Sequence, residues 1–345
     1  MSKSLGNSPD PLELIDKYGA DGVRVGMLLC SPAGNDLLYD DSLPEQGRNF
    51  ANKIWNAYRL IEGWECDDAI RQPESSKLAI EWMNNALDKA ITEIDENFSR
   101  FRISDALMVT YKLFWDDFSA WYLEAVKPEY MQPIDRNTLN STLSILDKLL
   151  KLLHPYMPFI TEELWQSLAP RGEKESIMIE MMPLSAGFDR ETAEEFDEAK
   201  EIISALRNIR KEKSIPMRDK AELIVINNKK LFNNRFVSVI VKLGNLSAIT
   251  FADQKPTGAA SFMVGIREFF VPVDENIDVE AEKERISKEL SYYRGFLTAV
   301  NKKLSNEKFV AGAPPAVVET EQKKRSDAEA KITTLESQLA AISKR

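Results

Sequence analysis

The sequence is poor in the residues that build metal sites and nucleophilic sites. Its 345 residues include one histidine, His154, and two cysteines, Cys30 and Cys66. The cysteines lie far apart and match no metal-ligand spacing, so we predict no metal site. Free thiols are ordinary in a reducing compartment, which favours a cytoplasmic protein. A lone histidine without a metal or carboxylate motif is interpreted as structural rather than catalytic.

Long apolar runs are lacking as well. No segment approaches the roughly 20 apolar residues that cross a bilayer. The first residues, MSKSLGNSPDP, contain no apolar stretch of a secretory signal. We therefore expect no membrane partner. Hydrophobic residues make up 43% of the chain and charged residues 29%, so it can bury cores and is not disordered. Its length predicts two or three domains.

An excess of positive charge is also missing. The net charge of -10 argues at first against a nucleic-acid partner, but phosphate binding needs only local basic patches. Between residues 207 and 220, six basic residues stand against two acidic ones, a balance of +4. Between residues 301 and 345, nine stand against six, a balance of +3. Either patch alone is also typical of an ordinary solvated helix face.

The first half of the chain is predicted to be helical. Short helices are expected over 12–18 and 21–29, with Asp10 as the N-cap of the first and Gly19 as its stop. From residue 43 to 168 apolar positions recur at helical spacing, and short turns separate the helices. This pattern favours an antiparallel helical bundle. We expect most of its tryptophans to lie in the core: Trp55, Trp82, Trp115 and Trp121.

The second half changes character twice. After a short strand at 176–180 and a helix over 194–213, β-branched and aromatic alternation predicts strands at 223–226, 248–251 and 262–273. A small α/β module is therefore expected.

The last seventy or so residues carry apolar heptads on both sides of a break at Gly312–Pro315. Two such helices fold back as an antiparallel coiled-coil hairpin. At ~1.5 Å per residue, this arm projects roughly 40 Å.

Three blocks resemble class I aminoacyl-tRNA synthetases of the valyl, isoleucyl and leucyl group. Residues 1–7, MSKSLGN, resemble the second half and the flank of the KMSKS signature, and the likeness continues to Arg24. Residues 48–59, RNFANKIWNAYR, resemble the first helix of the anticodon-binding bundle. Residues 154–165, HPYMPFITEELW, resemble another block of that bundle. The likeness covers essentially the full chain and is weakest over 185–265.

Two further blocks favour the valyl branch. Residues 31–36, SPAGND, resemble the valyl enzymes more than the isoleucyl ones. Residues 303–310, KLSNEKFV, with the Ala, Pro and Val residues that follow, resemble the tip of the C-terminal arm of the valyl enzymes. An isoleucyl or leucyl type of synthetase is the alternative within the group.

The resemblance implies a domain order and a fold class. We expect a remnant of the KMSKS loop with a stem-contact region over 1–42, and a helical anticodon-binding bundle over 43–190. A small α/β linker module over 191–275 and a coiled-coil tRNA-binding arm over 276–345 follow. The fold class is thus mainly α.

The resemblance also implies an incomplete enzyme. In the family the KMSKS loop acts on the phosphates of ATP, where ammonium groups stabilise developing charge. Lys3 matches the second lysine as the catalytic group, and Ser2, Lys3 and Ser4 match ATP contacts. The HIGH signature needs two histidines and this chain has one. We therefore expect the catalytic and editing domains to lie outside this sequence.

The full-length protein is then an ATP- and Mg-dependent ligase that attaches an amino acid, valine in the valyl branch, to its tRNA. The isolated chain is expected to bind no cofactor and to be inactive. Because it begins inside a catalytic loop, we expect it to be part of a longer protein. The side chains of Val25, Met27, Leu28 and Leu29 are then expected to be exposed or to mediate association of an otherwise monomeric chain.

The implied partner is tRNA, tRNA(Val) in the valyl branch, and not DNA. Asn49, Asn52, Lys53 and Asn56 share one helix face, and Arg59 extends it. Asparagine is a mediocre helix former, so three of them in eight residues suggest a functional surface. We predict that these residues bind the anticodon.

The arm is expected to meet the outer corner of the tRNA. Arg294, Lys302, Lys303 and Lys308 are predicted to contact phosphates, and Phe309 either packs on exposed bases or fills the hairpin turn. A third set is predicted to contact a tRNA stem: Arg207, Arg210 and Lys211.

A helical scaffold that binds proteins and no RNA is the alternative from another class. Its support is the acidic net charge and the heptads. Partner binding by a scaffold should be insensitive to salt, whereas tRNA binding should weaken steeply as salt rises.

Overall fold

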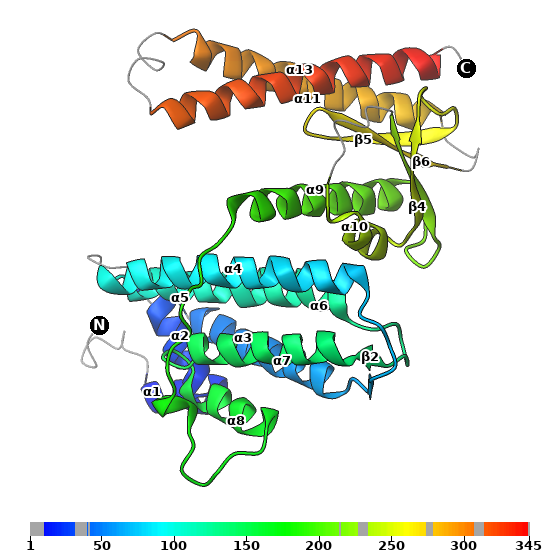
Figure 1. The fold of residues 1–345 in the computed structure, drawn as a ribbon. Coiled ribbons are helices and arrows are strands. Elements are labelled where there is room, and N and C mark those ends of the chain that lie inside the picture. The colour runs from blue at the N-terminus through cyan, green and yellow to red at the C-terminus, as the bar shows by residue number, and fades with distance from the viewer. Residues whose placement is uncertain are drawn as a thin grey trace. The chain divides into compact units, whose positions relative to one another are not determined.

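The computed structural model describes residues 10–31, 40, 42–213, 215–226, 234–273, 279–306 and 314–343. The chain divides into two compact units, Met1–Asp197 and Glu198–Arg345, whose helices and strands are labelled in Figure 1. Within the described residues, no helix has the length and apolarity needed to cross a membrane.

The first unit is helical, as predicted. Its elements are α1 (Pro11–Tyr18), α2 (Ala20–Leu29), α3 (Ser42–Glu62), α4 (Glu74–Ser99), α5 (Ile103–Lys112), the π-helix η2 (Leu113–Tyr122), α6 (Leu123–Val126), α7 (Arg136–Leu153), α8 (Pro158–Leu168) and the start of α9 (Arg190–Glu212). Two short strands, β1 (Cys66–Asp67) and β2 (Ile134–Asp135), pair in parallel. The prediction of a mainly α bundle is confirmed.

Helix α1 begins where the sequence predicts. The Asp10 side chain accepts a hydrogen bond from the Leu12 amide at 2.9 Å, and Pro11 occupies the first helical position. Gly19, with a φ of 77°, ends the helix. Local sequence therefore determines both ends of α1.

Helices α2 and α3 approach each other until their backbones touch. A Cβ atom added to Gly47 of α3 would lie 2.2 Å from the carbonyl oxygen of Gly22 in α2. Val25, on the same helix as Gly22, is fully buried. The expectation that this apolar segment is exposed is therefore wrong for Val25, which is buried within the first unit. Met27, Leu28 and Leu29 are half-buried.

The tryptophans depart from the prediction. Trp82 is buried and stacks on Phe196 with ring centroids 3.7 Å apart. Trp55 is 42% exposed, and Trp115 and Trp121 are half-buried. Trp55 follows Ile54, a core position, so it points about 100° away from the buried stripe of α3.

Two local predictions in this unit are wrong. Residues 176–180 contain a short 3₁₀ helix, Ile177–Ile179, in place of a strand. The helical spacing from residue 43 to 168 predicts α-helix through residues 113–122, where the structure has the ten-residue π-helix η2. Apolar periodicity indicates a helix there but does not distinguish hydrogen bonds to the fourth residue from those to the fifth.

The second unit contains a four-stranded sheet in the order β4-β3-β6-β5. The strands are β3 (Ala221–Ile226), β4 (Leu246–Ala252), β5 (Ala259–Val264) and β6 (Arg267–Pro272). Strands β3 and β4 are parallel and are connected through α10 (Val237–Gly244), a helix that was not predicted. The remaining pairs are antiparallel. The predicted α/β module is confirmed.

The single strand predicted over 262–273 is a hairpin. Strands β5 and β6 are joined at Gly265, whose φ is 55°. Glycine adopts this left-handed conformation at little cost, so the chain reverses there. The alternation of residues continues through the turn, which conceals it in the sequence.

The arm consists of α11 (Val279–Leu304) and α13 (Pro315–Ser343), lying side by side (Figure 1). Arg294 pairs with Glu336, whereas Lys303, further along α11, pairs with Glu321, which lies earlier in α13, so the helices are antiparallel. Ile286, Leu290 and Leu335 form a buried cluster between them. The predicted hairpin is confirmed.

Candidate nucleic-acid interface

One face of α3 presents the polar side chains that the sequence singled out. Asn49, Asn52, Asn56 and Arg59 are exposed, and Lys53 is half-buried. The opposite face is anchored in the core by fully buried residues such as Phe50 and Ile54. The helix thus holds a row of amide and cationic groups at the surface, and such groups can bond the edges of unstacked bases.

The surface beside Lys53 continues onto the π-helix. The Lys53 ammonium group lies 4.9 Å from the centroid of the Trp115 ring. That ring stacks on Tyr111, with centroids 5.5 Å apart and planes 11° apart. An aromatic pair therefore borders the polar face, which sequence reasoning missed because Trp115 was assigned to the core.

A polar junction joins two blocks that the sequence analysis treated separately. The Asp21 carboxylate of α2 accepts hydrogen bonds from the amides of Ile160, at 2.8 Å, and Phe159, at 3.3 Å, at the start of α8. The Arg24 guanidinium donates to the carbonyl oxygens of Tyr156 and Pro155, both at 3.1 Å. Burial raises the pKa of the Asp21 carboxyl above its usual value, although the two amides and Arg24 oppose the shift.

His154 belongs to this junction. Its Nδ1 lies 2.8 Å from the Thr161 hydroxyl, and that hydroxyl donates its own proton to the Met157 carbonyl at 2.7 Å. The Thr161 oxygen must therefore accept, so the histidine carries a proton on Nδ1. Burial lowers the pKa of His154 below its usual value. These contacts support a structural role.

The basic end of α9 does not present all its cations to solvent. Arg210 is fully buried. Its guanidinium donates to the carbonyl oxygens of Gly244, Asn245, Pro216 and Asp219. The expectation that Arg210 contacts tRNA is therefore corrected, because its charge is committed to the backbone of neighbouring loops.

The other two cations of this set lie nearer the surface. Arg207 is half-buried and donates to the Leu243 carbonyl at 3.4 Å, and Lys211 is exposed.

The cations of the arm are exposed but partly paired. Arg294 lies 2.6 Å from Glu336, and Lys303 lies 3.7 Å from Glu321. Lys302 is exposed. Lys308 and Phe309 lie outside the described residues, as do Ser2, Lys3 and Ser4.

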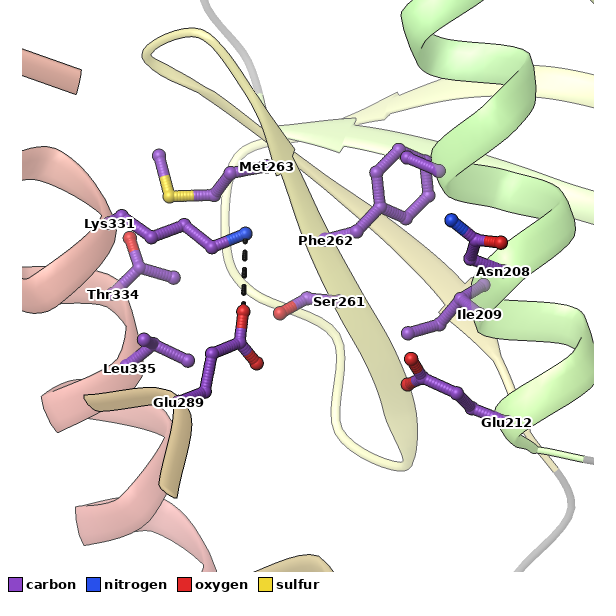
Figure 2. Close-up of a pocket in the computed structure, with 11 residues that line it drawn as sticks. Asn208, Ile209, Glu212, Ser261, Phe262, Met263, Glu289, Lys331, Thr334 and Leu335 are labelled. Atoms are coloured by element: carbon purple, nitrogen blue, oxygen red, sulfur yellow. Dashed lines mark ion pairs between the residues drawn. The ribbon is translucent and has the colours of Figure 1, made fainter. Parts of the chain in front are cut away.

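A cavity of about 160 Å³ opens between α9, β5 and the two helices of the arm. Figure 2 shows Lys331 in an ion pair with Glu289 across its edge, at 3.6 Å. Glu212 and Ser261 contribute further polar groups. Two carboxylates and one ammonium group leave this lining negative, so it is poorly suited to a phosphate. No cluster of ligands for a metal ion occurs among the described residues.

Two parts of the chain match known families. Residues 81–225 match the family described as the anticodon-binding domain of tRNA ligase. Residues 278–343 match the valyl tRNA synthetase tRNA binding arm. The first match begins within α4, includes η2 and α5 to α9, and ends in β3, and the second coincides with the coiled-coil hairpin.

Curated relatives match along almost the whole chain. The chain is 54% identical to a valine–tRNA ligase of Parabacteroides distasonis, over 100% of its own length and 39% of the relative's. It is 53% identical to the valine–tRNA ligase of Porphyromonas gingivalis, over 98% of its own length and 38% of the relative's. It is 32% identical to that of Chlorobaculum tepidum, over 99% and 40%.

Among solved structures, the chain is similar to LeuRS of Agrobacterium radiobacter in a ternary complex with tRNA and LeuAMS. The match covers 70% of this chain and 27% of the LeuRS chain. It is 19% identical, with a TM-score of 0.38.

The chain thus spans about two fifths of the length of the curated relatives that it matches. The two matched families cover the helical bundle from within α4 onward and the arm. The chain belongs to the valyl-tRNA synthetase family and corresponds to the C-terminal portion of its members, which carries the anticodon-binding domain and the tRNA-binding arm.

Proposed function

We propose that this chain binds tRNA(Val) at two places, the anticodon loop and the outer corner, as part of a valine–tRNA ligase. The whole enzyme would attach valine to tRNA(Val) with ATP and Mg. The matched anticodon-binding domain and tRNA-binding arm support tRNA as the partner.

The exposed polar face of α3 carries the anticodon part of the proposal. Asparagine amides offer both a donor and an acceptor, so they can bond the Watson–Crick edges of bases that leave the stack. Three exposed asparagines, with Lys53 and Arg59, line this face. A solvated surface without a function gains nothing from three mediocre helix formers.

The arm carries the second contact. Helices of the observed length reach roughly 40 Å at ~1.5 Å per residue. Arg294, Lys302 and Lys303 are proposed to meet phosphates along it, and Lys308 and Phe309 stay proposed contacts from the resemblance alone. Arg207 and Lys211 are proposed for a stem, without Arg210.

The catalytic part of the proposal rests on the resemblance of residues 1–7. Lys3 would act on the phosphates of ATP, with Ser2 and Ser4 beside it, once the remaining three fifths of the protein are present. The chain alone is proposed to be inactive. Charging of tRNA with valine by a preparation free of host synthetase would contradict this.

Equilibrium binding tests the tRNA proposal. The chain is titrated with valine tRNA, isoleucine tRNA and a valine tRNA with a swapped anticodon, each at two salt concentrations. We expect the tightest binding for valine tRNA, a loss on swapping the anticodon, and a steep decrease with salt from counterion release. Equal binding of all three, or binding that salt does not change, would contradict the proposal and favour a protein scaffold.

A further inference from the structure

We infer that Trp115, presented by the π-helix η2 beside α3, is a stacking platform for one unpaired base of the bound RNA. This inference rests on the proposed anticodon binding and adds a specific contact to it. It concerns a residue for which the sequence predicted only a place in the core.

The helical stretch formed by α5 and η2 carries two rows of aromatic rings with different surroundings. Phe114, Phe118 and Tyr122 are fully buried and contact one another in series, the first two rings tilted with centroids 5.2 Å apart and the last two stacked with centroids 5.6 Å apart. This row already fills the core beneath η2. Tyr111 and Trp115 form a separate pair that is only half-buried. The second row is therefore only partly used in packing.

The second row lies next to the polar face of α3. The buried Phe50 of α3 packs against both rings of this row, with its ring centroid 4.5 Å from that of Tyr111 and 6.2 Å from that of Trp115. Lys53, a member of the proposed anticodon face, has its ammonium group 4.9 Å from the Trp115 ring. The indole is thus held in one orientation and lies at the border of the amide-bearing face.

The helix type favours this presentation. A π-helical segment adds a residue to the turn and shifts the following side chains around the axis, and such segments occur frequently at functional sites. Here η2 extends over ten residues, Leu113–Tyr122, within a continuous helical stretch. It also lies within the residues that match the anticodon-binding domain family, 81–225.

The charges around Trp115 argue for stacking rather than for phosphate binding. Asp116 is exposed and Asp117 half-buried, beside the cations Lys53 and Lys112. Mixed charges of this kind give no strong attraction for a backbone phosphate. A base has a π-face whatever its sequence, so an aromatic platform with a neighbouring cation suits it.

The test uses the whole chain and an anticodon stem-loop of valine tRNA. Trp115→Ala should weaken binding roughly 5- to 150-fold, the range for loss of one base–aromatic stack. Trp115→Phe should restore most of the affinity. The matched control is Trp121→Ala, the same change at a half-buried tryptophan of the same π-helix, which should leave affinity within about twofold.

A second readout separates stacking from mere support of the fold. Each loop base is replaced in turn by an abasic nucleotide, and binding is measured with the wild-type and Trp115→Ala chains. One position should weaken wild-type binding and have no further effect on the variant, because both changes remove the same stack. The salt slope should stay unchanged in Trp115→Ala, because loss of an uncharged ring changes no counterion release.

Trp115→Leu covers the case in which the alanine variant does not fold, because leucine keeps apolar bulk without a flat ring. A folded leucine or alanine variant with wild-type affinity would overturn the inference, as would additive effects at every abasic position. If the wild-type chain itself shows no anticodon-dependent binding, the proposed function fails and this inference with it. If binding depends on the anticodon but is unchanged by replacing Trp115, the stacking role of Trp115 is refuted and the proposed anticodon binding still stands.

Discussion

The carboxylate of Asp21 caps the first turn of α8 by accepting the Ile160 amide proton at 2.8 Å, although 139 positions separate the two residues. A helix start has unpaired amides and a partial positive charge, and a carboxylate satisfies both. In the sequence, the likeness that runs from residue 1 to Arg24 and the block 154–165 are separate. Their direct contact shows that the N-terminal helices are fixed to the bundle through the start of α8.

Replacing Asp21 tests this cap and its pH dependence. Because burial raises its folded pKa above the ordinary value of 3.8, the folded state binds more protons just above that pH. The contribution of Asp21 to stability therefore falls as pH rises through this window. The free energy of unfolding of wild type, measured relative to that of Asp21→Asn by urea titration, should decrease from pH 4 upward.

Asp16→Asn, a change at an exposed carboxylate of α1, is the control and should show little such trend. A difference between wild type and Asp21→Asn that grows with pH would contradict a raised pKa.

His154 should titrate below its ordinary value of 6.5, because burial disfavours the cation. The unfolded state then binds more protons below that value. The contribution of His154 is therefore fully present above about pH 6.5 and is lost as pH falls toward the folded pKa. The chain has one histidine, so a single imidazole signal followed by NMR gives its pKa directly. A midpoint at or above 6.5 would refute the lowered pKa.

Arg210 should matter for stability and not for RNA binding. Its guanidinium holds the carbonyl oxygens of four residues between α9 and the loops at the edge of the sheet. Arg210→Lys cannot reach all of them and should cost about 2–4 kcal/mol of unfolding free energy, from the loss of charged hydrogen bonds in a buried place. Urea unfolding measures this cost.

Lys211→Ala, one residue further along α9, is the matched comparison. It should leave stability within about 0.5 kcal/mol and lower the salt dependence of tRNA binding. An Arg210→Lys chain that is stable but binds tRNA weakly would reverse this assignment.

Two glycines in helices should respond in opposite directions to alanine. Gly47→Ala would place a methyl group 2.2 Å from the Gly22 carbonyl oxygen, and the forced separation of α2 and α3 should destabilise the chain by about 1–3 kcal/mol. At Gly295 in α11, an added Cβ meets nothing within 4 Å. Gly295→Ala should stabilise the arm by about 0.5–1 kcal/mol, the ordinary helix preference.

Thermal unfolding of the two variants measures this contrast. Equal effects of the two changes would show that helix propensity, and not the close approach of α2 and α3, controls position 47.

The sequence by itself determined the features that depend on neighbours along the chain. The Asp10 cap, the stop at Gly19, the heptads of α11 and α13, and the shared face of Asn49, Asn52 and Asn56 all follow from local spacing. These were predicted and the structure bears them out. The family blocks likewise indicated the bundle and the arm before any coordinates.

Tertiary structure decided what depends on neighbours distant in the chain. Composition gave no reason to bury Arg210, whose carbonyl partners belong to loops brought together by the β3–β4 connection. Val25 is fully buried on α2, a helix that meets α3 closely through glycines. The half-buried state of Trp115 follows because Phe114 and Phe118 already fill the core. Burial depends on which segments pack around a residue in the folded chain. Apolar periodicity describes only the helix or strand that carries the residue, and not the segments that pack against it.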